Sequence, residues 1–331
     1  MRTEMTLNRA CKSLIRSLSL AAALILLSAC DDSTSSQSDH TQGVRTASEQ
    51  EEIQKYNAYV EVANSVRRPY AEDLATYQSV VKPVFDGKKK EDDLLFPSSS
   101  TMSQIKDNLD KARTMKPDMA DIDGPAKAYS DALKNVIPLD RDMANYIESK
   151  AYLGDKSAHG REIQPAYISA MEALAMAQEN YDNAIEAKDR ARIKSAFDNA
   201  EKGTLAYFRI GMVYRIKESM NFASGFLSGS GLGDERDAFK TSLDQFNAMA
   251  TGYDNKIREQ NNEGCSAIMS KANAYLSTGR QIVNRTEEGS YEKDKQQRSQ
   301  FQMMQSREQE DANSLLQDYN NMISRLNMNQ C

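Results

Sequence analysis

Tryptophan is absent from this 331-residue sequence, and histidine, cysteine and proline are scarce, with two, four and seven residues respectively. One histidine, His40, lies in a polar N-terminal segment, so His159 is the single imidazole available for chemistry. This scarcity excludes most metal centres, which use several imidazole or thiolate ligands, and leaves His159 as the one possible base of a catalytic triad. Few prolines and glycines interrupt the periodic segments, whereas Ala, Glu, Lys, Gln, Met and Leu are plentiful. This composition predicts an all-α fold with little or no sheet.

The N-terminus has the organisation of a secretory signal. Arg2, Arg9, Lys12 and Arg16 precede the run from Leu18 to Leu27, which is apolar except for one serine. A run of about ten apolar residues is typical of a signal peptide and too short to span a bilayer comfortably. We therefore expect export from the cytoplasm.

The apolar run ends in Leu27-Ser28-Ala29-Cys30, which resembles a bacterial lipobox. In a lipobox a branched apolar residue and two small residues precede the cysteine that is acylated, and cleavage leaves that cysteine as the first residue. The alternative is an ordinary signal peptide with a cysteine there by chance. The sequence predicts a signal peptide over 1–29 and a lipid anchor at Cys30.

The mature chain is acidic. Removal of residues 1–29 changes the formal net charge from −6 to about −9. A nucleic-acid partner needs concentrated Lys and Arg, and adsorption to anionic lipid needs a basic surface. We therefore expect no nucleic-acid partner, and we expect attachment to the lipid bilayer through the acyl chains on Cys30.

A polar tether follows the anchor and leads to one helical domain. Residues 30–48 contain one large apolar side chain, Val44, so this segment cannot bury enough surface to repay ordering. Residues 49–331 hold the periodic segments. We expect the folded domain to begin at residue 49, and the sequence leaves open a division into two lobes near residue 155 or near residue 230.

Hydrophobic residues recur every three or four positions through the domain, the pattern of amphipathic helices. The pattern predicts a bundle of about seven to nine helices. The first runs over 49–82 and is interrupted at Pro69. A capping box over Thr101–Gln104 starts another, and Pro125 is expected at the first position of a third, which Pro138 should kink or divide. Residues 287–300 fit either a loop or a solvated helix.

Cys265 and Cys331 remain as thiols once Cys11 leaves with the signal peptide and Cys30 is acylated. They are the available pair for a disulfide in an oxidising compartment. The alternative is two free thiols.

Two motifs are candidates for chemistry. His159 and Glu162 are spaced so that, on a helix, they could share a divalent ion, but no second pair with this spacing is present. We interpret them as a surface pair and expect no bound metal and no cofactor. Fifteen tyrosines, many of them on apolar stripes, fit core packing, with a groove for a carbohydrate or peptide as the alternative.

Several segments together resemble the YiiG-like lipoproteins, a bacterial family grouped under a domain of unknown function. They are Cys30-Asp31-Asp32, the polar tether, Lys55-Tyr-Asn-Ala-Tyr-Val60, Ile122-Asp-Gly-Pro-Ala-Lys-Ala-Tyr129 and Tyr319-Asn-Asn321. The resemblance implies an all-helical lipoprotein domain without an established activity. The one functional residue that the resemblance implies is the acylated cysteine, Cys30.

The resemblance also bears on location and function. In enteric bacteria, Asp31 and Asp32 directly after the lipidated cysteine resemble a signal for retention in the inner membrane, on its periplasmic face; outer-membrane placement is the alternative. We expect a non-enzymatic envelope protein that binds an unknown envelope protein or ligand or has a structural role. Two alternatives are an envelope hydrolase that acts on peptidoglycan or protein through carboxylates, and a small-ligand or metal binder.

Overall fold

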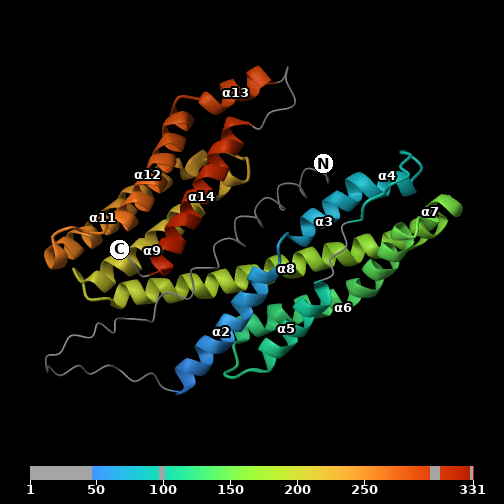
Figure 1. Ribbon diagram of the computed structural model, residues 1–331, viewed down its shortest axis with the longest axis horizontal. Coiled ribbons are helices and arrows are strands. Elements are labelled where there is room, and N and C mark those ends of the chain that lie inside the picture. Colours follow the sequence, from blue (N-terminus) through green and yellow to red (C-terminus); the bar gives the residue numbers. More distant parts are fainter. Residues whose placement is uncertain (1–46, 97–100, 299–305, 329–330) are drawn as a thin grey trace. The chain divides into compact units, whose positions relative to one another are not determined.

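The computed structural model describes residues 47–96, 101–298, 306–328 and 331 (Figure 1). Within these ranges the chain contains no β-strand, which confirms the all-α prediction. In the described part of the chain, nine α-helices have nine or more residues, and shorter segments bring the total slightly above the predicted range. No helix in these ranges combines the length and apolar character needed to cross a bilayer. The predicted signal peptide, the anchor at Cys30 and nearly all of the tether lie outside the described residues.

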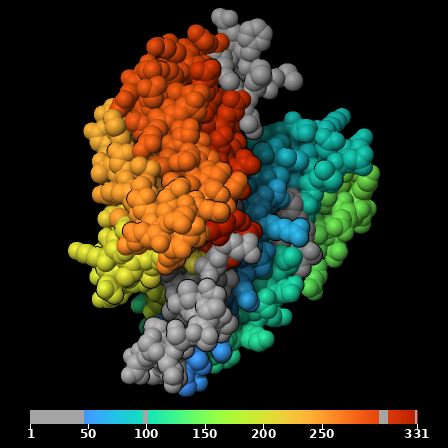
Figure 2. Space-filling view, turned by 60° about the vertical axis from the view of Figure 1, so that its left-hand side comes forward, coloured from blue at the N-terminus to red at the C-terminus, as the bar shows by residue number. Residues whose placement is uncertain are grey.

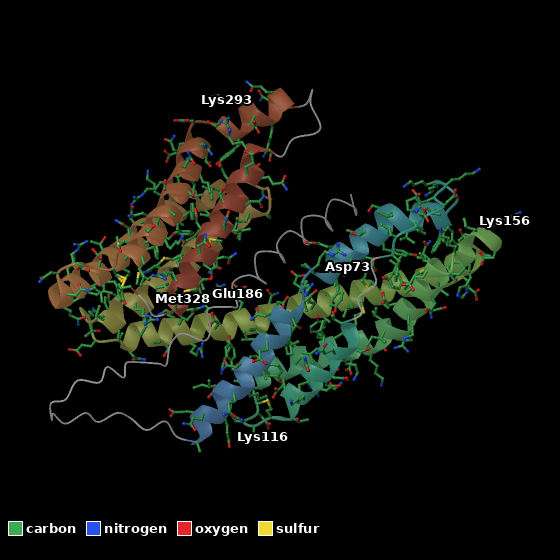
Figure 3. The ribbon with its side chains drawn as sticks, in the orientation of Figure 1. Asp73, Lys116, Lys156, Glu186, Lys293 and Met328 are labelled. Carbon is green, nitrogen blue, oxygen red and sulfur yellow. A yellow bond between two sulfur atoms is a disulfide. The ribbon has the colours of Figure 1, made fainter. Side chains whose placement is uncertain are left out.

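The chain divides into two compact units, of which the first ends at Glu186 and the second begins at Ala187 (Figure 3). This boundary lies within α8, Ala158–Asn199, a helix of 42 residues. Neither of the two positions that the sequence left open, near 155 and near 230, is the boundary. Because no proline or glycine marks residue 186, helical propensity continues through it and the local sequence carries no signal for the division.

The first unit contains the N-terminal helices and the first part of α8. The interruption that Pro69 was predicted to cause in the helix over 49–82 is confirmed, because α2 ends at Ser65 and α3 begins at Tyr70. The helices before α8 are α2 Ala47–Ser65, α3 Tyr70–Thr76, the π-helix η2 Tyr77–Val81, α4 Lys82–Phe85, α5 Met102–Thr114, α6 Ala120–Glu148 and α7 Ala151–Gly154. Helix α5 packs against α6 and against α2.

One predicted helix cap and one predicted helix start are wrong. Helix α5 begins at Met102 as expected, but the Thr101 side chain makes no capping hydrogen bond. Its backbone is helical, with φ −90° and ψ −10°, rather than in the extended conformation that a capping residue usually adopts. Helix α6 begins at Ala120, not at Pro125, because the Met119 amide donates to Asp123 Oδ2 over 2.8 Å and stabilises an earlier turn.

Pro138 does not divide α6, so of the two outcomes expected from the sequence, a kink or a division, the division is wrong. Proline removes one backbone donor from a helix and usually costs about 3 kcal/mol. The helix nevertheless continues, since it buries side chains on both sides of the proline, among them Leu133, Val136 and Met143. Tertiary packing therefore outweighs the local cost.

Tyrosines form much of the core of the first unit. Tyr59, Tyr77, Tyr129, Tyr167 and Tyr181 are each fully buried. The Tyr77 and Tyr167 ring centroids are 4.8 Å apart, and those of Tyr129 and Tyr181 are 5.4 Å apart. The stripe of tyrosines that the sequence offered for a groove is thus core packing.

The second unit contains the remainder of α8 and the C-terminal helices. Helix α9 packs on α11, α11 on α12, and α12 on α14, which Figure 2 shows in red beside the orange α12. Within the segment 287–300, which the sequence left open, residues 290–298 form helix α13, most of whose described side chains other than Tyr291 are exposed. The helices are α9 Leu205–Phe222, α10 Ser224–Leu227, the 3₁₀-helix η3 Gly233–Glu235, α11 Arg236–Asn261, α12 Ser266–Glu287, α13 Ser290–Arg298 and α14 Arg307–Asn327.

Two glycines allow α9 and α11 to approach closely. A Cβ atom on Gly211 would lie 2.5 Å from the Met249 sulfur, and one on Gly252 would lie 2.2 Å from the Phe208 ring. Both separations are far below van der Waals contact. Glycine at these positions therefore sets the spacing of the helix pair that lines the groove described below.

Candidate functional site

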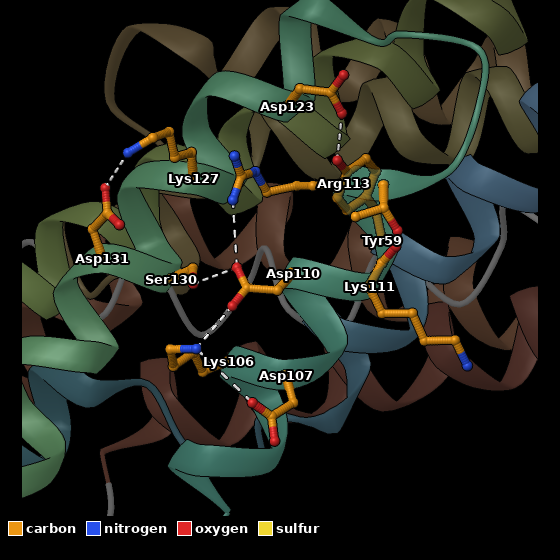
Figure 4. Close-up of polar contacts among 11 residues, drawn as sticks. Tyr59, Lys106, Asp107, Asp110, Lys111, Arg113, Asp123, Lys127, Ser130 and Asp131 are labelled. Carbon is orange, nitrogen blue, oxygen red and sulfur yellow. Dashed lines mark hydrogen bonds and ion pairs between the residues drawn. The ribbon is translucent and has the colours of Figure 1, made fainter.

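A buried lysine connects α2 to the start of α6. Lys55 has no exposed surface, and its ammonium group lies 2.8 Å from Asp123 Oδ1 and 3.0 Å from Oδ2. The Tyr59 hydroxyl also donates to Asp123 (Figure 4). Burial alone would raise the pKa of Asp123, but the hydrogen bonds from Lys55, Tyr59 and the Met119 amide outweigh it and lower that pKa. The carboxylate is therefore held in its ionised form.

This cluster unites two of the segments on which the family resemblance rests. Lys55 and Tyr59 belong to the segment 55–60, and Asp123 belongs to the segment 122–129. Because Lys55 is inaccessible to a ligand, the cluster is structural. No pattern within either segment indicates that the two would meet.

Further carboxylates lie in the core of the first unit. Among them, Asp73 on α3 (Figure 3) and Asp140 on α6 are 5% and 4% exposed. Arg68 lies 2.6 Å from Asp73 Oδ1. Burial nevertheless raises the pKa of Asp73 to about 6, with Arg68 opposing and with Glu72 and Asp140 adding to the increase. Asp73 is thus ionised at neutral pH at a cost in stability.

We expect Asp73→Asn to raise the free energy of unfolding at pH 8 by about 1–3 kcal/mol and to change it little at pH 4. The pKa of Asp73 is about 6 in the folded state and 3.8 ordinarily, so between pH 3.8 and about 6 the folded state binds more protons than the unfolded state. The contribution of Asp73 to stability is therefore fully present below pH 4 and is lost as the pH rises through about 6. Urea unfolding at several pH values measures the effect. The exposed Asp121→Asn is the control, and an equal gain at both pH values for Asp73→Asn would refute the assignment.

The sequence-predicted pair His159 and Glu162 lies at the surface near the start of α8. His159 Nδ1 is 3.8 Å from Glu162 Oε2, and Nε2 is 3.3 Å from Asp142 on α6. Asp142 was not apparent from the sequence, since it lies 17 positions away. No group of three or more His, Cys, Asp or Glu side chains within the described ranges has the arrangement of a metal site.

The second unit has an open groove of about 390 Å³ between α9 and α11. Charged, amide, hydroxyl and aromatic side chains share its surface. The groove is lined by Arg215, Glu218, Phe222, Asp237, Ala238, Thr241, Ser242 and Gln245. None of these residues stood out in the sequence, because α9 and α11 contribute them as single residues or adjacent pairs about one helical turn apart.

Three half-buried aromatic rings stack beside Arg215, which lines this groove. Phe197 from α8 lies between Tyr207 and Tyr214 of α9, with centroid distances of 5.1 and 5.2 Å and interplanar angles of 21° and 25°. The Arg215 guanidinium carbon lies 5.0 Å from the Tyr214 ring centroid and 5.6 Å from that of Phe197. Its Nη1 donates to Glu218 Oε2 over 2.6 Å. Arg215 therefore lies in the groove wall with its orientation set by rings and by a carboxylate.

Both groove carboxylates lie beside cations. Glu218 is paired with Arg215, and Asp237 Oδ1 is 2.9 Å from Arg236 Nη2. General acid–base catalysis by two carboxyl groups requires that their pKa values differ strongly, which neighbouring cations oppose. The groove instead offers fixed donors and acceptors to a bound molecule.

Cys265 and Cys331 form a disulfide, with 4.8 Å between their Cα atoms. The Cys265 amide donates to Asp254 Oδ1 over 2.6 Å, and Asp254 Oδ2 accepts from Arg258. One end of the bridge is thus fixed to the last turns of α11. The other predicted functional residues, Cys30, Asp31 and Asp32, lie outside the described residues.

Comparison with known proteins places the chain in a family. A family profile described as "Protein of unknown function (DUF3829)" matches residues 50–328. "Uncharacterized protein YiiG" of Escherichia coli (strain K12) is 23% identical over 178 residues, 52% of this chain and 51% of that protein, so the chain spans about half the length of this relative. No solved structure matches the sequence. The YiiG-like resemblance is confirmed, and the chain belongs to the DUF3829 family of proteins of unknown function.

Proposed function

We propose that this chain is a lipid-anchored protein of the bacterial cell envelope whose helical domain binds a ligand or partner without catalytic turnover. One observation carries the proposal: the basic segment and short apolar run end directly in Leu27-Ser28-Ala29-Cys30. Acylation of Cys30 would attach the chain to a bilayer, since more than one acyl chain gives lasting attachment.

The disulfide supports an extracytoplasmic location. Disulfides persist in oxidising compartments such as the periplasm and are rare in the reducing cytosol. Cys265 and Cys331 are bonded, and the chain has no other cysteines beyond residue 30. Asp31 and Asp32 favour the periplasmic face of the inner membrane over the outer membrane.

The groove between α9 and α11 supports binding rather than hydrolysis. A carboxylate-dependent hydrolase would need a concave site with two inward-facing acids and no cationic neighbour. Glu218 and Asp237 each have an arginine within ion-pair distance. The observations therefore favour a ligand held by preoriented polar groups.

Palmitate labelling of cells that express the wild type or Cys30→Ala tests the anchor. We expect the label on the wild-type protein to fall to background in the variant, because the acylated sulfur is removed. Membrane fractionation on a density gradient then locates the labelled protein in the inner or the outer membrane.

Cys11→Ala is the matched control, because Cys11 lies within the predicted signal peptide and should be removed with it. This variant should label as the wild type does. A wild-type chain that is secreted without label would refute the anchor and leave a soluble exported domain.

A further inference from the structure

We propose that the groove between α9 and α11 binds a neutral saccharide. The inference rests on the binding role proposed above and gives it a ligand class. The groove places a guanidinium next to a carboxylate, and a side-chain amide and two hydroxyls on the facing helix. Both hydroxyls donate to backbone carbonyls of α11, so their oxygens serve as acceptors. A sugar hydroxyl both donates and accepts a hydrogen bond, so neighbouring hydroxyls match alternating donors and acceptors.

The central donor is oriented before a ligand arrives. Arg215 lies over the Tyr214 and Phe197 rings and is hydrogen-bonded to Glu218, yet 23% of its side chain remains exposed. Side chains that are already ordered lose less conformational entropy when a ligand binds. A planar guanidinium with unused N–H groups can therefore serve as a fixed donor in the groove wall.

The charges at the groove do not favour an anionic ligand. Arg215 is paired with Glu218, and Asp237 in the lining is paired with Arg236, so each arginine already has a carboxylate partner. A phosphate or an acidic peptide would have to compete with those carboxylates, whereas a neutral polyol would not. Hydroxyls can donate to both carboxylates without an ionic cost.

The groove also has an apolar surface and a suitable size. Phe222 and Ala238 lie among the polar groups, and an aromatic ring presents a negative face to the weakly positive C–H groups of a sugar. The volume of about 390 Å³ lies within the usual range for small-ligand pockets. Together these features describe a shallow site for a short oligosaccharide.

Isothermal titration of the purified full chain with chitotriose and with maltotriose tests the proposal. Saturable binding of either sugar supports it, and preference between them distinguishes an N-acetylhexosamine strand from a glucose polymer. We expect Arg215→Lys and Gln245→Ala each to weaken that binding by at least about tenfold. Lysine keeps the charge of Arg215 but cannot reproduce its planar donor group.

Lys240→Ala is the matched control, because Lys240 is exposed and adjoins Thr241 in sequence but does not line the groove. It should leave the dissociation constant unchanged. Circular dichroism verifies that each variant is folded. The proposal is overturned if neither sugar binds below about 10 mM, if both groove variants bind as the wild type does, or if trialanine binds and the sugars do not. Acylation of Cys30 is measured separately, so either proposal can fail alone.

Discussion

Replacing Asp123 with alanine should lower the free energy of unfolding by about 3 kcal/mol. Lys55 is fully buried, and its ammonium group lies 2.8 Å from the Asp123 carboxylate that the substitution removes. A buried cation left without its partner usually costs 3–5 kcal/mol. We expect the lower end, because 25% of the Asp123 side chain is exposed and water can replace part of the lost interaction.

A second ion pair on α6 provides the control. Asp131 pairs with Lys127 over 2.5 Å, and both side chains are 58% exposed (Figure 4). Asp131→Ala should cost less than about 1 kcal/mol, since solvent screens exposed pairs. Urea denaturation followed by circular dichroism measures both variants.

A double variant distinguishes the loss of the Lys55–Asp123 attraction from the cost of leaving the buried Lys55 charge unpaired. Lys55→Met combined with Asp123→Ala removes both charges, so it should be more stable than Asp123→Ala alone. If the double variant is instead less stable than Asp123→Ala, the cost does not arise from an uncompensated lysine.

Removing the Cys265–Cys331 disulfide should lower the free energy of unfolding by about 4 kcal/mol. The bond closes a loop between residues 66 positions apart, and the open chain regains conformational entropy when it unfolds. Cys331→Ser is the most informative variant, because Cys331 is exposed and Cys265 is fully buried. The substitution breaks the bond without creating a cavity.

A reductant supplies the matched measurement. Dithiothreitol should destabilise the wild type to the level of Cys331→Ser and should have no further effect on that variant. Equal stability of the wild type with and without reductant would show that the bond does not constrain the unfolded chain. Denaturation curves at fixed pH provide both comparisons.

Local signals account for the helices. Residues three and four positions apart share one face of a helix, so a stripe such as Tyr167, Met171, Leu174, Tyr181 and Ile185 identifies its core side without knowledge of its neighbours. The two prolines that were expected to interrupt helices behave differently. Pro69 lies in the break between α2 and α3, directly before α3 begins, whereas α6 continues through Pro138, because burial on both sides of the latter offsets a missing hydrogen bond.

No comparable pattern in the sequence indicated the candidate groove. Phe197 stacks between Tyr207 and Tyr214, and Arg215 turns toward Glu218 in the groove wall. Phe197 belongs to α8 and the other four residues to one side of α9, so the stack depends on how α8 packs on α9. The groove itself depends on how closely α9 and α11 pack, which Gly211 and Gly252 permit.

By itself, the sequence determined the helical class, the helix-forming segments and the family resemblance, because each depends on residues that are neighbours along the chain. Only the tertiary structure decided that Lys55 meets Asp123, that the units divide within α8, and that a polar groove forms beside a stack of rings. Such features arise from contacts between distant residues, whose pairing is set by the packing of whole helices rather than by any local pattern.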